Sequence, residues 1–327
     1  MSSMTDQCVV VITTNGDAHI PYVSKHLKSR LVIIDPSELA AGKGLTFVLE
    51  NDKIVVEYNG ETLNNVVGVW YRKPQPITNQ KLPVRDEYKQ YSQQSLYWHV
   101  AHLLTSFQDA LWLSDYFAMI RACNKGLQLA TASKVGFNVP ETVITSSKAR
   151  AEEFAATHSQ FISKPHVVGT PKINGQQKVL LTTLFDKDHQ PDLANLHLAP
   201  TILQNAIDVK DDVRIIVVGE KTFAATVNSS YEQTDQNKHL RDNRAGHYEG
   251  TVDIKEIKLP SDIASKCTAH VRELGLQFGA IDMLVDKNGK WWFLENNPNG
   301  QWAYIEHATG QPIGKAIAKL LETGSSL

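Results

Sequence analysis

Two acidic side chains and one carboxamide near the C-terminal end of the chain are the residues best suited to chemistry. Asp282 lies within one apolar run of strand length, and Glu295 ends the next run, with Asn297 two positions later. The sequence Asp-Lys-Asn-Gly between the two runs is typical of a hairpin turn. Alternate residues of an extended strand point to the same side, so Glu295 and Asn297 face the same way. Because Mg²⁺ prefers carboxylate and phosphate oxygens, these three residues predict a magnesium site.

A second feature is Lys164, the single charged residue of the short apolar run 161–165. An unpaired buried ammonium group is costly, so we expect an anion beside it, and a phosphate is the natural candidate. Gly169 and Gly175 bracket the polar loop that follows, where backbone N–H groups could contact phosphate oxygens. This part of the chain therefore favours nucleotide binding.

The elements that must position these residues are mostly strands. The N-terminal part alternates short apolar runs with a helix, which favours a parallel sheet. We predict strands at 9–13, 31–34 and 66–71, a hairpin at 45–58, and helices at 20–28, 84–112 and 119–135. Further on we predict a strand at 201–205, a hairpin at 211–225, and helices at 261–274 and 311–321. Arg72 and Lys73, at the end of one strand, are expected to be exposed, either as a solvated basic pair or with a functional role.

Composition narrows the function classes. A chain of 327 residues with 42% apolar residues can form two or three subdomains with sizeable cores. Its net charge of -2 argues against binding nucleic acid through phosphate contacts. We find no signal-peptide pattern and no run long enough to span a membrane, so we expect a cytoplasmic protein. Cys8, Cys123 and Cys267 are too far apart in sequence to suggest a metal site.

The run Phe-Leu-Glu-x-Asn-Pro-Asn-Gly-Gln-Trp at 293–302 resembles the metal-binding end of the ATP-grasp fold. It is most similar to the graspetide synthetases, the ribosomal-peptide maturases that include microviridin ligases. Lys-x-x-Gln-Leu from Lys125 is similar to the entry of an ATP-grasp domain. The resemblance implies an α/β fold with an N-terminal α/β pre-ATP-grasp domain at 1–113. A central lid with a linker helix would follow at 114–200, and a C-terminal lobe with the magnesium site at 201–327.

The resemblance also implies roles for individual residues. Arg214 looks like the arginine of the family's Asp/Glu-x-Arg motif, which meets the transferring phosphate. The strand 201–205 would contact adenine as the hinge between two lobes, and Asp208 could replace the acid that the family usually has at the ribose. Residues assigned to ATP are thus Lys125, Lys164, Gln204, Asn205, Ile207, Asp208 and Asn243, and those assigned to catalysis are Arg214, Lys164 and Arg241.

The expected function is an ATP-dependent ligase that activates a carboxylate as an acyl phosphate and joins it to an amine or alcohol. The favoured substrate is a leader-bearing ribosomal precursor peptide, partly because the helical region at 88–98 is rich in aromatic residues. Arg241 and Asn243 resemble a small-molecule glutamate-ligase branch instead, so a ligase for free amino acids or small carboxylates stays open. A nucleotide-binding protein without turnover is a further alternative, and a homodimer is compatible with all three.

Overall fold

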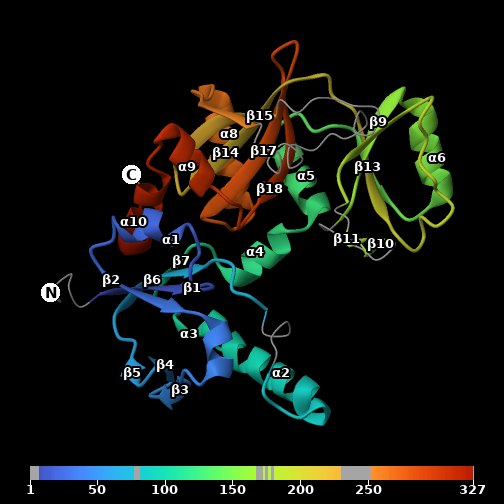
Figure 1. The fold of residues 1–327 in the computed structure, drawn as a ribbon. Helices are drawn as coiled ribbons and strands as arrows, with labels where there is room; N and C mark the ends of the chain where they lie inside the picture. Colours follow the sequence, from blue (N-terminus) through green and yellow to red (C-terminus); the bar gives the residue numbers. More distant parts are fainter. Residues whose placement is uncertain are drawn as a thin grey trace.

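The computed structural model describes residues 7–76, 82–166, 180–229 and 252–326, together with the backbone of a short hairpin at 172–173 and 176–177. Figure 1 shows three main groups of elements in a mixed α/β fold. A parallel sheet lies near the N-terminus, a five-stranded sheet is formed mainly by the C-terminal part, and a four-stranded sheet lies to one side. Among the described residues, no helix combines the length and apolar character that a membrane span needs.

The N-terminal sheet contains β1 (Cys8–Ile12), β2 (Arg30–Ile34), β6 (Val66–Tyr71) and β7 (Leu111–Trp112) in the order β2-β1-β6-β7. All its described pairings are parallel, which confirms the predicted parallel sheet. Beside it lie β3 (Leu45–Glu50), β4 (Lys53–Tyr58) and β5 (Glu61–Thr62), and the remaining elements of this part are α1 (Ile20–Ser24), η2 (Pro36–Ala41), α2 (Asp86–Ala101) and α3 (Leu103–Ser106). The predicted hairpin is confirmed residue for residue.

The helical predictions in the first half need three corrections. The helix predicted at 20–28 ends at Ser24, because the next residues make hydrogen bonds that span three residues and not four. His26 N–H, for example, donates to Val23 O. The pattern at 84–112 ends as a helix at Ser106, since Leu111–Trp112 pairs with the edge of β6 instead. The helix predicted at 119–135 is two helices, α4 (Tyr116–Ala122) and α5 (Lys125–Lys134). The Asn124 side chain accepts the Leu127 N–H and starts a new helix there.

The lateral sheet has the strand order β12-β9-β13-β8 and is antiparallel. Its strands are β8 (Thr142–Thr145), β9 (Gln160–Lys164), β12 (Thr183–Asp186) and β13 (Thr201–Asn205). Helix α6 (Lys148–Thr157) packs on it, and Phe154, Phe161 and Leu203 are central to the core they share. This core contains no residue of the other described clusters.

The C-terminal sheet has the order β16-β15-β14-β17-β18, with every described pairing antiparallel. Its strands are β14 (Val209–Val218), β15 (Lys221–Ser229), β16 (Val252–Glu256), β17 (Phe278–Asp286) and β18 (Trp291–Asn297). Both predicted hairpins are confirmed. Helix α8 (Ser261–Glu273) packs on one face, whereas α9 (Ala303–Thr309), which the sequence did not predict, and α10 (Ile313–Thr323) lie on the other.

The helix α10 joins the first and last parts of the chain. It contacts β6, α1 and β14, and its apolar face shares one core with Val9, Trp70 and Ile216. Two glycines permit this close approach. A Cβ added to Gly68 would lie 2.4 Å from the Leu321 carbonyl oxygen, and one added to Gly314 would lie 2.3 Å from the Tyr22 oxygen. The N-terminal sheet and the C-terminal sheet are therefore packed against each other through α10.

Candidate active site

Three charged side chains form one row across adjacent strands of the C-terminal sheet. Arg214 on β14 is the register partner of Asp282 on β17, and Asp282 is the partner of Glu295 on β18. Directly opposed residues have close side chains, so this register places the three groups together. Arg214 Nη1 lies 3.0 Å from Asp282 Oδ1 and donates to Asp282 Oδ2 at 3.1 Å.

The strand β18, which carries the predicted metal ligands, is irregular at this point. Asp282 pairs with Glu295 whereas Met283 pairs with Phe293, so Leu294 is an extra residue in the strand. Such a bulge turns the side chains that follow it, and bulges are common beside active sites. Asn296 is buried, and Glu295 and Asn297 on either side of it are more exposed. The prediction that Glu295 and Asn297 share a side agrees with this pattern.

The pKa values of the three side chains in this row shift in different directions. Burial, with Glu295 and Asp212 nearby, raises the pKa of Asp282 above its ordinary value, although Arg214 opposes this. Burial alone would also raise the pKa of Glu295, but Lys125, Lys164 and Arg214 lower it. For Arg214 burial would lower the pKa, yet the Asp282 carboxylate and the Tyr304 hydroxyl raise it. Two carboxylates thus lie close together, and a cation bound beside them would stabilise the charged form of both.

Helix α5 is fixed to strand β18 at two places. Lys125, its first residue, forms an ion pair with Glu295. One turn later the Gln128 carboxamide accepts the Asn296 N–H at 2.9 Å and donates to the Asn296 carbonyl at 2.8 Å. Because Asn296 lies between Glu295 and Asn297, Gln128 fixes the backbone that carries both predicted metal ligands. Its spacing of three from Lys125 was the signal in the sequence for this role.

A second residue that the sequence reasoning missed is Tyr304 on α9. Its hydroxyl accepts a hydrogen bond from Arg214 Nε at 3.2 Å, so it fixes the orientation of the guanidinium. The unpredicted helix α9 carries this residue, two positions after Trp302. A Tyr shortly after the Asn-Gly-Gln-Trp run was therefore the only sequence signal.

Three of the residues predicted for ATP lie on the lateral sheet. Lys164, at the end of β9, is near enough to the acidic pair to help lower the pKa of Glu295. On β13, Gln204 is buried and donates to Thr142 Oγ1 at 2.9 Å. Among the described residues, Gln204 Oε1 and Asn205 Oδ1 have no hydrogen-bond partner although both are buried. Unused acceptors of this kind suit a donor such as an adenine amino group.

The remaining predicted residues are less closely associated with the row. Ile207 is partly buried after β13, and the exposed Asp208 forms an ion pair with Lys287 at 2.8 Å. Arg241 and Asn243 lie outside the described residues, as do the glycines of the predicted phosphate loop, Gly169 and Gly175.

The donor set fits a magnesium ion held jointly with a nucleotide. No group of three His, Cys, Asp or Glu side chains gathers within the described ranges, so the protein offers two carboxylates and one amide here. Mg²⁺ is commonly bound by one or two carboxylates together with phosphate oxygens. Asp282, Glu295 and Asn297 would hold such an ion beside the phosphates.

Comparison with solved structures shows which proteins share this fold. A RiPP-associated ATP-grasp ligase from Chryseobacterium gregarium, in complex with ADP and a leader and core peptide, is 22% identical over 96% of each chain with a TM-score of 0.84. The macrocyclase MdnC from Microcystis aeruginosa MRC, bound with precursor peptide MdnA, is 22% identical over 98% of this chain and 100% of its own, with a TM-score of 0.82. The ligase PsnB, complexed with minimal precursor, Mg and ADP, is 18% identical over 98% of both chains, with a TM-score of 0.74. The protein is an ATP-grasp ligase, an ATP-dependent enzyme.

The family follows from the sequence. A model of the RimK-like ATP-grasp domain matches residues 122–321, which is more than half of the chain. The chain belongs to this family. By sequence it matches none of the curated proteins.

Proposed function

We propose that this enzyme uses ATP to join side chains within a ribosomally made precursor peptide. The observation that carries the proposal is the row of Arg214, Asp282 and Glu295, which places a fixed guanidinium beside two carboxylates. The acyl donor is the carboxylate of an Asp or Glu side chain, and the nucleophile is an amine or hydroxyl of the same peptide. The product is an amide or ester crosslink, and ATP becomes ADP and phosphate.

The first step needs positive charge around the transferring phosphoryl group. The donor carboxylate attacks the γ-phosphorus of ATP, and the bond from phosphorus to the ADP oxygen breaks. Negative charge is then spread over the phosphoryl oxygens, and Arg214 and Lys164 stabilise it. Tyr304 and Asp282 keep the guanidinium in place before the step begins. Bound Mg²⁺ would neutralise further phosphate charge at Asp282, Glu295 and Asn297.

The second step forms the crosslink. The amine or hydroxyl attacks the acyl carbon, phosphate leaves, and the nucleophile loses a proton. The acyl phosphate is also open to water, so the donor and the nucleophile must be held close together in one site. Two side chains of one peptide meet this condition without a second binding event.

A peptide substrate is supported by the surface of α2 and by the similar structures. The aromatic side chains Tyr88, Tyr91, Tyr97 and Trp98 are between 48% and 71% exposed, and α2 buries none of its residues. Aromatic residues with polar tips are enriched where proteins bind one another. The similar ligases from Chryseobacterium gregarium and Microcystis aeruginosa MRC are complexed with peptides.

The experiment is a mass measurement with two classes of substrate. The protein is incubated with ATP, Mg²⁺ and the peptide encoded beside its gene, and in parallel with a panel of free amino acids. We expect the peptide to lose one water per crosslink, with ADP released in step. ADP release with free amino acids and an unchanged peptide would replace this proposal by a small-molecule ligase. ATP binding without ADP release under either condition would leave only a nucleotide-binding protein.

A further inference from the structure

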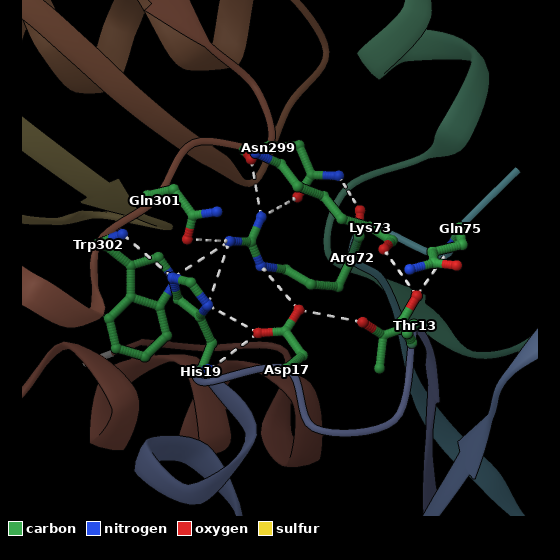
Figure 2. A network of polar contacts seen from close by, with 10 residues as sticks. Thr13, Asp17, His19, Arg72, Lys73, Gln75, Asn299, Gln301 and Trp302 are labelled. Carbon is green, nitrogen blue, oxygen red and sulfur yellow. Dashed lines mark hydrogen bonds and ion pairs between the residues drawn. The ribbon is translucent and has the colours of Figure 1, made fainter. Parts of the chain in front are cut away.

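Arg72 is one of the largest fully buried side chains of the protein, although its place at the end of β6 had predicted exposure. It is 1% exposed, and its guanidinium lies between the N-terminal sheet and the loop that follows β18 (Figure 2). A buried guanidinium is stable only if its donors find acceptors. The position of those acceptors shows what Arg72 holds.

Most of the acceptors belong to the loop after β18. Arg72 Nη1 donates to the carbonyl oxygen and to Oδ1 of Asn299, at 2.8 Å in each case. Arg72 Nη2 donates to Gln301 Oε1 at 3.0 Å, and the Asn299 side-chain amide donates back to the Arg72 carbonyl. Figure 2 shows these contacts converging on one guanidinium. Arg72 therefore fixes both the backbone and the side chain of Asn299.

The opposite side of Arg72 is supported by His19 and Asp17. His19 Nδ1 lies 2.7 Å from Asp17 Oδ1, so this nitrogen carries the proton and donates to the carboxylate. His19 Nε2 is then an acceptor, for Arg72 Nη2 at 3.1 Å and for the Trp302 N–H at 3.3 Å. These contacts keep the guanidinium aimed at the loop.

The held loop begins at the predicted metal ligand. The Asn299 N–H donates to Asn297 Oδ1 at 3.0 Å, which orients the Asn297 carboxamide. We propose that Arg72 is a positioning residue for the metal site: it holds Asn299, and Asn299 orients Asn297. The proposal rests on the proposed function, because Asn297 acts as a ligand only if the protein binds Mg²⁺ with a nucleotide.

The test separates positioning from stability by measuring the magnesium response. Three variants are compared with the wild-type protein: Arg72→Lys, Asn299→Ala and both together. The control is Arg121→Lys at an exposed position, because Arg121 Nη2 also donates to a backbone carbonyl, that of Leu274 at 3.2 Å, outside the loop after β18. Two quantities are measured: the rise in Tm that Mg²⁺ adds in the presence of ADP, and the Mg²⁺ concentration that gives half-maximal ADP release with ATP and the adjacent peptide.

We expect Arg72→Lys to raise the half-maximal Mg²⁺ concentration about tenfold and to remove most of the magnesium-dependent rise in Tm. Binding of ADP in EDTA should not change. Asn299→Ala should have a similar effect, and the double variant should be no worse than either single one, because both act on the same contact. Arg121→Lys should lower Tm without altering the magnesium response.

Three results would overturn the proposal. If Arg72→Lys and Arg121→Lys lower Tm and leave the magnesium response equally intact, Arg72 is only structural. If Arg72→Lys does not fold, an unchanged magnesium response in Asn299→Ala leads to the same conclusion. A wild-type protein whose ADP binding ignores Mg²⁺ would instead overturn the metal site itself, and the role of Arg72 with it.

Discussion

The two charged clusters on either side of Asn297 differ in the charge of their partners and in how exposed they are. Around Arg72 the acceptors are mostly neutral oxygens and a neutral imidazole, and the guanidinium is closed off from solvent. Around Arg214 the partners are the Asp282 carboxylate and the Tyr304 hydroxyl, and the side chains of Asp282 and Glu295 are 32% and 39% exposed. The first cluster is closed to a ligand, although Arg72 Nε has no hydrogen-bond partner among the described residues, whereas the carboxylates of the second are partly open to one.

The pKa directions of the two arginines show the same difference. Burial lowers the pKa of Arg72 to about 10, and Asp17, whose Oδ2 is 3.7 Å from Nε, only partly opposes this. Burial would lower the pKa of Arg214 as well, but the contacting Asp282 raises it. An arginine held by neutral groups positions its surroundings, while one held by carboxylates belongs to a site that collects charge.

The largest effect is expected for Asp282→Asn, which removes negative charge from the cluster around Arg214. ADP release should fall by about 10³-fold or more, because a neutral amide offsets less of the charge of Mg²⁺. Tm should change little, since asparagine has the same shape and the side chain is partly exposed. ADP release and thermal melts are measured beside Asp253→Asn, an exposed carboxylate on β16. Near-wild-type turnover in Asp282→Asn would remove the metal assignment.

Arg214→Lys tests the cation of the same cluster. A lysine keeps the charge but loses the planar fork and the bond to Tyr304, so kcat should fall by roughly 10²–10³-fold. The affinity for ATP should change much less, because the lost contacts matter most in the transition state. Steady-state kinetics at varied ATP measures both quantities. If ATP affinity fell while kcat held, Arg214 would bind the ground state only.

Asp17→Asn tests the cluster around Arg72, where we expect a loss of stability. It removes the charge that opposes a buried guanidinium, so unfolding in urea should require about 3 kcal/mol less free energy. Turnover measured well below the new Tm should fall less than it does in Asp282→Asn or Arg214→Lys. Lost turnover with unchanged stability would show that Asp17 takes part in the chemistry and would remove the distinction between the clusters.

The smallest effect is expected for His270→Leu, outside both clusters. His270 is fully buried against Phe137 and Phe293, and neither ring nitrogen has a partner among the described residues. Burial lowers its pKa from 6.5 to about 4, so the unfolded chain binds the extra proton between these values. The wild-type protein therefore loses stability as pH falls below about 6.5, by roughly 2 kcal/mol at pH 5 from this group.

The leucine variant should not show that part of the loss. Its advantage in free energy of unfolding over the wild-type protein should grow as the pH falls from 7 to 5. A constant difference between His270→Leu and the wild-type protein across this range would contradict the assignment.

The sequence predicted the hairpins well, but it did not predict the register between Asp282 and Glu295. The apolar runs and the turn at Gly219-Glu220 are local signals, so hairpins such as β14–β15 follow from them directly. Whether Asp282 faces Glu295 depends on a one-residue bulge at Leu294, which no apolar pattern encodes. The two-residue strand β7 likewise exists only because β6 offers it an edge.

The partners of charged residues were harder still to predict. Arg72 meets Asn299 across 227 positions of sequence, so the strand end alone reads as a solvated basic pair. Lys125 and Gln128 show the opposite case, because both lie on one turn of a helix and reach neighbouring residues of one strand. Residue types predicted the chemistry, but only the packing of distant segments decides which charges are buried.

The close approach of α10 at Gly68 and Gly314 limits how the enzyme can move. With the Leu321 and Tyr22 backbones packed against these glycines, sliding the N-terminal sheet over the C-terminal sheet would break their common core. The lateral sheet has a core of its own, and among the described residues no glycine contact of this kind ties it to the other sheets. We therefore expect the first and last parts of the chain to behave as one rigid body, with a hinge on either side of β8–β13. Nucleotide entry and release would then depend on the swing of that sheet alone.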